Sequence, residues 1–354
     1  DPKVNWLYTT EPDPGTGGRQ HVWPRGKVLG GSSSINGLLY IRGQDADYDN
    51  WRQLGCEGWS GDDVLPYFKR AEANERGGDA FHGGDGPLSV VDQHWPNPGT
   101  TAFVASAGAL QLGSNPDFNG ANQDGFGLYQ VTQKAGERWS AARAYLSAKP
   151  NLTVKTGALV ERIVIENGRA TGVAVRFGDR REVLRARGGV VLSAGAFGSP
   201  QILMLSGIGP AAHLHEMGLP VVADLPGVGG NLSEHPRMML MYRAKKPVTF
   251  INQLRFDKAA LAFLQWALLG KGPFATQICS GTVLLKTRPE LDRPDIQLLC
   301  NPVRFDAGLW FPGIVKPKEH SFYITVCLLH QKSRGRVSLR SANPKDKPRI
   351  ALNL

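Results

Sequence analysis

The sequence lacks any apolar run of about 18 residues, the length that a membrane-spanning helix needs. Its 354 residues include only four cysteines, which lie far apart and form no C-x-x-C pair: Cys56, Cys279, Cys300 and Cys327. In a chain of this length, that spacing argues against a disulfide framework and predicts reduced thiols in a reducing compartment. No histidine lies at zinc-ligand spacing from a cysteine, so we predict no metal site.

Basic residues outnumber acidic ones and give a formal net charge of +10, a balance that can indicate a nucleic-acid partner. The lysines and arginines nevertheless come singly or in pairs, such as Arg180-Arg181 and Lys245-Lys246, and no basic patch is interleaved with aromatic residues. We therefore expect a solvated basic surface and no nucleic-acid partner. With 41% hydrophobic and 20% charged residues, the composition is that of a globular protein with a large core.

Glycine, by contrast, is abundant, and the most informative glycines form a pair. Gly30 and Gly31 come directly before the three serines at 32–34, and an apolar segment follows. Two glycines allow a tight turn and a close approach of the backbone to a ligand. Serines favour a helix N-terminus, so we predict a helix over residues 33–41. The N–H groups of such a turn suit an anionic group or the pyrimidine edge of a flavin; a Gly-Ser loop feeding an ordinary helix is the alternative.

Three segments of the chain resemble signatures of one enzyme family, and they occur in the family's order. Residues 25–37, which contain the glycine pair, are similar to the first signature of the glucose–methanol–choline (GMC) oxidoreductases, FAD-dependent enzymes that oxidise alcohols. Residues 195–210 resemble the second signature, and the glycine-rich residues 224–236 resemble a further segment. Shorter stretches at 45–72 and 138–146 also resemble the family.

The resemblance implies the fold class α/β, or α+β overall. It implies an incomplete FAD-binding domain of doubly wound type with a β-meander, and a substrate-binding domain built on an antiparallel sheet with helices. The FAD-binding domain would comprise residues 1–50 and 145–236, and the substrate-binding domain residues 51–144 and 237–354.

The residue pattern predicts individual elements of these domains. Residues 189–195 indicate a buried strand that ends in small residues beside a ligand. Ser199 and Pro200 predict the cap and first residue of a helix. Asn167-Gly168 predicts a hairpin turn. Alternating or apolar runs predict three strands of the meander at 152–155, 159–165 and 171–177, and further strands at 238–243, 295–300, 321–329 and 336–340.

Carried over residue by residue, the resemblance implies a noncovalent FAD site. Family members with covalently attached flavin carry a histidine where this chain has Ile35, and isoleucine cannot form that bond. The backbone at Leu159 and Val160 would meet the adenine ring. The residues implied in cofactor binding are Val28, Gly30, Gly31, Ser32, Asn36, Gly37, Leu38, Leu39, Val160, Ala194, Gly195 and Asn231.

The chain resembles an internal fragment of the family's enzymes, so we assign no catalytic residue in it. The strand–G-x-G-x-x-G–helix unit that holds the FAD pyrophosphate is expected before Asp1. The segment with the catalytic histidine is expected after Leu354. His213 and His215 lie two residues apart and cannot share a helix face, whereas His235 lies in the glycine-rich segment beside the expected cofactor.

The resemblance implies that the parent enzyme oxidises a primary alcohol to an aldehyde by hydride transfer to flavin N5, and the fragment alone is expected to be inactive. A flavin-containing hydroxynitrile-lyase-type enzyme and a truncated, non-catalytic chain are the alternatives. Choline-oxidising relatives carry a glutamate where this chain has Arg237, so we expect a neutral or anionic alcohol rather than choline. The electron acceptor would be a quinone, a cytochrome or oxygen, and the location cytoplasmic or peripheral to a membrane.

Overall fold

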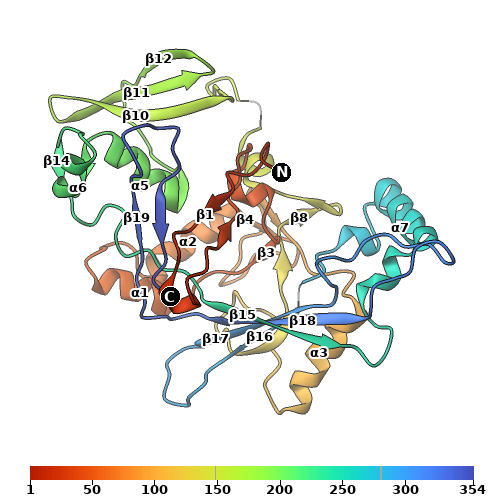
Figure 1. The fold of residues 1–354 in the computed structure, drawn as a ribbon. Helices are drawn as coiled ribbons and strands as arrows, with labels where there is room; N and C mark the ends of the chain where they lie inside the picture. Colours follow the sequence, from red (N-terminus) through yellow and green to blue (C-terminus); the bar gives the residue numbers. More distant parts are fainter. Residues whose placement is uncertain (148, 280) are drawn as a thin grey trace. The chain divides into compact units, whose positions relative to one another are not determined.

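The computed structural model describes residues 1–147, 149–279 and 281–354, which form two compact units (Figure 1). Unit 1 comprises Asp1–Lys27, Lys149–Glu234 and Gln331–Leu354, and unit 2 comprises Val28–Ala148 and His235–His330. The units group residues 28–50 and 331–354 differently from the predicted FAD-binding and substrate-binding domains. The roles of those domains stay a prediction.

A three-stranded antiparallel sheet in the order β10-β11-β12 forms one part of unit 1. β10 (Ala158–Glu166) and β11 (Arg169–Phe177) confirm two of the predicted strands. Asn167 and Gly168 between them have φ angles of 51° and 73°. Both angles lie in the left-handed region that a type I′ hairpin turn requires, so the predicted turn is confirmed.

The third strand of this sheet is β12 (Arg180–Arg185), which follows β11 after a short turn at Gly178 with φ of 60°. The predicted strand at residues 152–155 is wrong, because this stretch is irregular. The tight turn at Gly178 brings β12 back alongside the free edge of β11. The third strand of the sheet is therefore the segment that follows β11, and residues 152–155 do not form it.

Helix α5 (Gly195–Leu205) begins five residues before Pro200, the predicted first residue. The Ser199 hydroxyl accepts a hydrogen bond from the N–H of Ala194 at 3.0 Å, so it holds the residue that precedes the helix. Pro200 consequently lies in the second turn. The other elements of unit 1 are short: β1 (Tyr8–Thr9), η1 (Pro14–Thr16), β2 (Val22–Trp23), β13 (Ile208–Gly209), α6 (Ala211–Glu216), β14 (Ala223–Asp224), β19 (Arg336–Ser338) and β20 (Arg349–Ala351).

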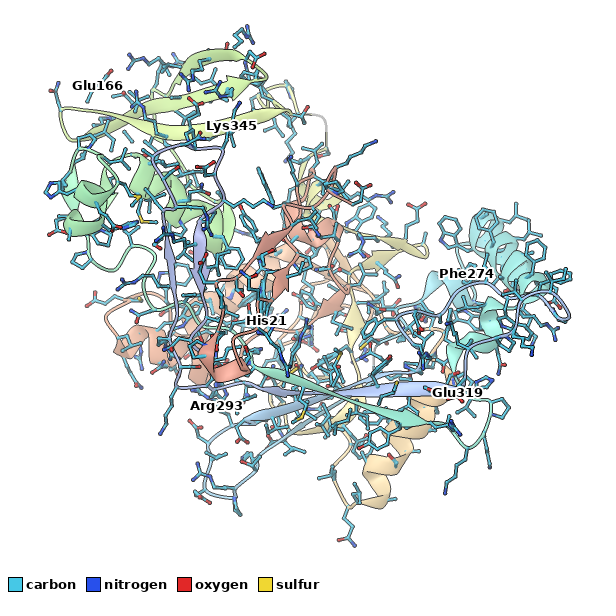
Figure 2. All side chains as sticks on the ribbon, in the orientation of Figure 1. His21, Glu166, Phe274, Arg293, Glu319 and Lys345 are labelled. Carbon is cyan, nitrogen blue, oxygen red and sulfur yellow. The ribbon has the colours of Figure 1, made fainter. Side chains whose placement is uncertain are left out.

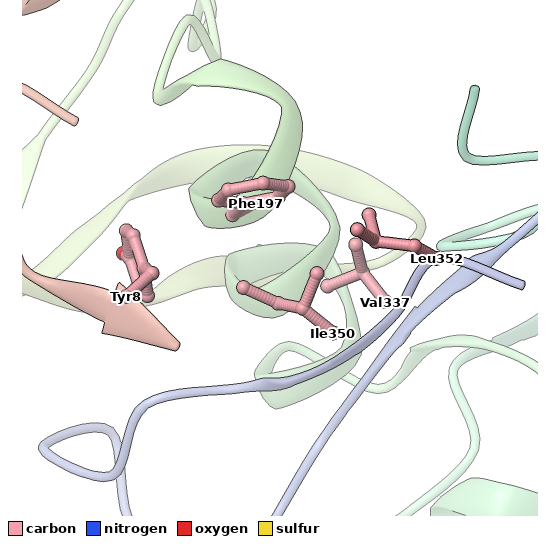
Figure 3. Packing of buried hydrophobic residues seen from close by; sticks show 5 residues of the cluster. All are labelled: Tyr8, Phe197, Val337, Ile350 and Leu352. Carbon is pink, nitrogen blue, oxygen red and sulfur yellow. The ribbon is translucent and has the colours of Figure 1, made fainter. Parts of the chain in front are cut away.

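The core of unit 1 joins residues that are distant in sequence. Figure 3 shows Tyr8, Phe197, Val337, Ile350 and Leu352 packed together. Phe197 of α5 is only 2% exposed, and its ring meets that of Tyr8 edge-on with centroids 5.3 Å apart. Such an aromatic pair adds about 0.5–1.5 kcal/mol to the effect of burial. The helix is therefore fixed by strands from both ends of the sequence.

Residues 189–194 do not form the predicted buried strand. They are irregular, and the side chain of Val191 is 92% exposed. An apolar run becomes a buried strand only where neighbouring strands pair with its backbone. None of the residues that the structure describes pairs with this segment in a sheet. The strand prediction is therefore wrong for this chain, although the small residues do lead directly into α5.

Unit 2 is built on a five-stranded antiparallel sheet in the order β15-β18-β17-β16-β6. Three of its strands confirm predicted ones, whereas β6 and β16 were not predicted. Helix α3 packs against β16. This sheet with helices has the architecture predicted for the substrate-binding domain. The strands are β6 (Gly125–Leu128), β15 (Arg237–Arg243), β16 (Gly281–Leu285), β17 (Ile296–Asn301) and β18 (Ser321–Leu328).

Side chains define the ends of the helices in unit 2. At the start of α2, the Ser60 hydroxyl accepts from the N–H of Asp63, whose carboxylate accepts from the N–H of Ser60 at 3.0 Å.

No helix in the described ranges is long and apolar enough to cross a membrane. The helices are α1 (Asp45–Gln53), α2 (Gly61–Ala71), α3 (Pro98–Ala109), α4 (Ala141–Tyr145), α7 (Phe256–Leu269) and the 3-10 helices η2 (Gly31–Ser34), η3 (Phe250–Leu254) and η4 (Pro273–Ala275). Short strands are β3 (Leu39–Tyr40), β4 (Glu72–Asn74), β5 (Leu88–Val90), β7 (Gln130–Val131), β8 (Gln133–Lys134) and β9 (Glu137–Arg138).

A buried polar cluster lies where α2 ends and β4 begins. Glu72 is fully buried and accepts hydrogen bonds from Arg42 and from His82, whose Nδ1 is 3.0 Å from the carboxylate. The Nε2 of His82 lies 2.8 Å from Asp117. Burial lowers the pKa of His82, but the hydrogen bonds to Asp117 and Glu72 outweigh that effect, so the net shift of the pKa is upward.

Candidate cofactor site

The glycine pair forms a left-handed turn in unit 2. Gly30 and Gly31 have φ angles of 85° and 55° and lead into η2, which ends at Ser34. A Cβ on Gly30 would lie 2.6 Å from the Ser34 hydroxyl oxygen, whereas a Cβ on Gly31 would meet nothing within 4 Å. Gly30 is therefore required by packing, and Gly31 faces open space of the kind that a ligand approaching the backbone needs.

The predicted helix over residues 33–41 is wrong. After η2, the Asn36 side chain accepts a hydrogen bond from the N–H of Leu38 at 3.0 Å, and Leu38 itself has φ of 66°. This local side-chain turn competes with helix formation. The chain instead enters β3, where Leu39 pairs with Val131. The serines thus belong to a single tight turn that leads to a strand.

The turn uses some of its backbone N–H groups internally and leaves others available. Gly31 donates to the carbonyl of Val28 at 2.8 Å, and Asn36 donates to that of Ser32 at 2.9 Å. Within the part of the chain that the structure describes, the N–H groups of Leu29 and Gly30 donate to no protein acceptor. The side chains of Val28 and Leu29 are 42% and 48% exposed. The entry to the turn therefore combines free donors with apolar surface, as a flavin ring requires.

Side chains distant in sequence fix the shape of this turn. The guanidinium of Arg138 donates to the Ser33 carbonyl at 3.1 Å and to the Asn36 side-chain and backbone oxygens at 2.7 and 2.8 Å. The Ser33 hydroxyl donates to the Gly30 carbonyl and accepts from the N–H of Ala141 at 2.9 Å. No local pattern in the sequence predicts this role of Arg138, although Arg138 opens a segment that resembles the family.

In unit 1, two predicted site residues line one cavity of about 210 Å³. Val160 contributes from β10 and Ala194 from the residue before α5, together with Leu159 and Ile202. β10 is an edge strand of its sheet, so its outer backbone groups face away from β11. Adjacent N–H and C=O groups along such an outer edge match the donor and acceptor positions of an adenine ring.

The other predicted residues of unit 1 lie near the start of α5. Gly195 has φ of 81°, and a Cβ there would meet no atom within 4 Å. Asn231 has φ of 55° and lines a second cavity of about 400 Å³ with Ala196 and Ser199. The N-terminal N–H groups of a helix of this length favour a partly anionic ligand. The residues of each unit thus fit a part of FAD, although their role in binding it stays a prediction.

Two histidines of the chain, His82 and His213, have hydrogen-bond partners within their own units. His82 is held between Glu72 and Asp117, and the Nε2 of His213 accepts from the N–H of Leu339 at 3.0 Å. In the described ranges, no group of three or more His, Cys, Asp or Glu residues is arranged to hold a metal ion.

Comparison with known proteins gives a consistent result. The family described as GMC oxidoreductase matches residues 13–237. The curated "oxygen-dependent choline dehydrogenases" of Rhizobium etli and Sinorhizobium medicae are 44% and 43% identical, over 99% of this chain and 64% of their own length. The crystal structure of pyridoxine 4-oxidase from Mesorbium loti is 28% identical with a TM-score of 0.84, covering 99% of this chain and 65% of that one. Formate oxidase from Aspergillus oryzae, at 23% identity and a TM-score of 0.87 over 99% of this chain and 67% of that one, shares the fold.

The family match spans all three signature segments, and the solved structures share the mixed architecture of the two units. The chain spans 64% of the length of the curated relatives it matches. The family match alone covers more than half of the chain. The chain therefore belongs to the GMC family of FAD-dependent oxidoreductases.

Proposed function

We propose that a protein containing this chain, at the full length of its relatives, oxidises a primary alcohol to an aldehyde with noncovalently bound FAD. The observation that carries the proposal is the left-handed turn at Gly30 and Gly31, which presents free N–H groups and open space within a GMC family signature. When bound, FAD supplies the acceptor for the hydride that leaves the alcohol carbon.

The residues of this chain would bind and orient the cofactor. The N–H groups of Leu29 and Gly30 would donate to the polar edge of the flavin, and Val28 would cover its apolar face. In unit 1, the outer edge of β10 at Val160 would hold the adenine, and the start of α5 at Gly195 would face anionic oxygens. Ile35 has no nucleophilic atom, which supports a noncovalent cofactor. No histidine of the chain is assigned as the base.

We propose a neutral or anionic alcohol as the substrate. Arg237 is exposed at the start of β15, and a cation there opposes a quaternary ammonium group. Choline is the second candidate, because the curated relatives are named choline dehydrogenases. The proposed acceptors are oxygen, which the name of those relatives supports, and a quinone or a cytochrome. We propose a cytoplasmic location, which is compatible with peripheral attachment to a membrane.

Anaerobic mixing of the full-length flavoprotein with primary alcohols tests the reaction. Loss of the oxidised-flavin absorbance, with aldehyde as the product, is the expected result. A flavin that stays oxidised while cyanohydrins release aldehyde would instead assign the lyase alternative. The 354-residue chain alone, assayed in parallel, tests the expectation that it is inactive. Turnover by the chain alone would refute that expectation.

A further inference from the structure

Helix α7 presents several large apolar side chains to solvent, whereas two of its alanines face the protein. Ala259 and Ala262 are 6% and 2% exposed, whereas Leu264 and Leu268 are 52% and 77% exposed. Figure 2 shows side chains projecting from the outer side of α7, near the labelled Phe274. A surface helix normally turns its large apolar residues toward its own core. The outer face of α7 thus has the composition of a contact surface.

The exposed surface continues onto the loop of residues 305–315. The N–H of Phe256, at the start of α7, donates to the carbonyl of Trp310 at 2.9 Å. The rings of Phe256 and Phe311 lie with centroids 5.8 Å apart. Ile314, at the tip of the loop, is 78% exposed. Contiguous apolar surface of this kind marks a site for a partner or a membrane.

The charges around this surface favour an anionic partner. No acidic residue occurs between Asp257 and Glu290. Lys258 lies in the first turn of α7, Lys271 lies two residues beyond its end and Lys316 follows the loop. These lysines take part in no ion pair within the described ranges. The nearby acids are already neutralised by arginines: Asp257 by Arg255, Asp306 by Arg304 and Glu319 by Arg243.

We propose that α7 and the loop of residues 305–315 dock onto an anionic lipid bilayer. With 14 residues, α7 is shorter than the roughly 20 that span a bilayer, so it lies in the plane of the interface. Leu264 and Leu268 enter the acyl boundary, and the flanking lysines meet anionic headgroups. This inference is independent of the flavin chemistry.

Co-sedimentation of the full chain with vesicles tests the proposal. Binding is expected to vesicles of phosphatidylcholine mixed with phosphatidylglycerol, to weaken with added salt, and to be much lower with phosphatidylcholine alone. The double variant Leu264→Glu/Leu268→Glu should bind at least about tenfold more weakly, because two apolar side chains are lost from the interface. The matched control, Leu54→Glu/Leu110→Glu, changes two leucines of unit 2 that are 75% and 74% exposed and should bind like the wild type.

A second pair of variants keeps the proposal testable if the glutamates disturb folding. Lys258→Gln and Lys271→Gln should each weaken binding to the mixed vesicles about fivefold. Absence of binding by the wild type, or equal binding by the leucine variant and its control, would overturn the proposal. Sedimentation velocity without lipid tests whether a second copy of the chain covers this face. If the wild type and the control variant are dimers and the Leu264→Glu/Leu268→Glu variant is a monomer, the face is a dimer interface and the lipid proposal is wrong.

Discussion

Arg138 donates two hydrogen bonds to Asn36, one to its side-chain oxygen at 2.7 Å and one to its backbone carbonyl at 2.8 Å. This pair joins β9 to the turn that the family resemblance assigns to the flavin. The planar guanidinium holds its N–H donors in a rigid fork that reaches both acceptors, a geometry that the lysine ammonium lacks.

The Arg138→Lys variant of the full-length protein should bind FAD roughly tenfold more weakly or worse, because hydrogen bonds to a charged group are worth about 1.5–3 kcal/mol. Fluorescence titration of the apoprotein with FAD measures this directly. Arg143→Lys, which changes an exposed arginine of α4 paired with Glu137, is the control and should bind normally. Equal affinities in the two variants would contradict a positioning role for Arg138.

Alanine substitutions at the two glycines should have unequal effects. Gly30→Ala introduces a Cβ 2.6 Å from the Ser34 hydroxyl oxygen at a φ of 85°, whereas Gly31→Ala meets no atom within 4 Å. The left-handed conformation alone costs about 1–2 kcal/mol in either variant. The clash should make Gly30→Ala the less stable of the two in urea unfolding. FAD affinity should fall in both, and unchanged affinity in Gly31→Ala would argue against a ligand in that open space.

The buried His82 predicts a pH dependence of stability. Its pKa is raised in the folded protein, so its contribution is complete below the unfolded pKa of about 6.5 and is lost as pH rises through the folded value. The groups facing it are Glu72, Asp117, Asn74 and, through Glu72, Arg42.

The free energy of unfolding of the wild type should therefore fall, relative to that of His82→Asn, as pH increases above about 6.5. Urea titrations across this range measure the difference. His215→Asn, which changes an exposed histidine, should follow the wild type. A constant difference between wild type and His82→Asn would mean that the pKa of His82 is not raised in the native state.

Exchange of the charge at position 237 tests the choice of substrate. The wild type should oxidise 3,3-dimethylbutan-1-ol, the neutral analogue of choline, with a higher kcat/KM than choline. In Arg237→Glu, the kcat/KM for choline should rise about tenfold relative to that for the neutral alcohol. Arg243→Glu, at the other end of β15, is the matched control and should leave the ratio unchanged. A wild type that prefers choline would contradict the proposed substrate class.

Local signals predicted the parts of the fold that depend on neighbouring residues. The hairpin turn at Asn167-Gly168 requires two left-handed residues, and only a few residue types adopt that conformation easily. Such features are independent of the rest of the chain and can therefore be predicted from a short stretch of sequence.

The failed predictions concern features that depend on distant partners. Residues 189–195 carry the apolar pattern of a buried strand, but a strand exists only where another strand pairs with it. The turn after Gly31 is held by Arg138, about a hundred residues further on. No local pattern contains that contact. The cofactor-binding residues carried over from the family stay predictions. Each unit contains only some of these residues.

The packing of Tyr8 against Phe197, in the same core as Ile350, has a consequence for synthesis on the ribosome. A domain that folds as it is translated needs its contacts early, yet this core lacks two of its strands until residues 336–351 leave the exit tunnel. Most of unit 1 must therefore wait, incompletely packed, while the 96 residues of His235–His330 are translated. Nascent unit 1 should consequently depend on chaperones until residue 351 has left the exit tunnel.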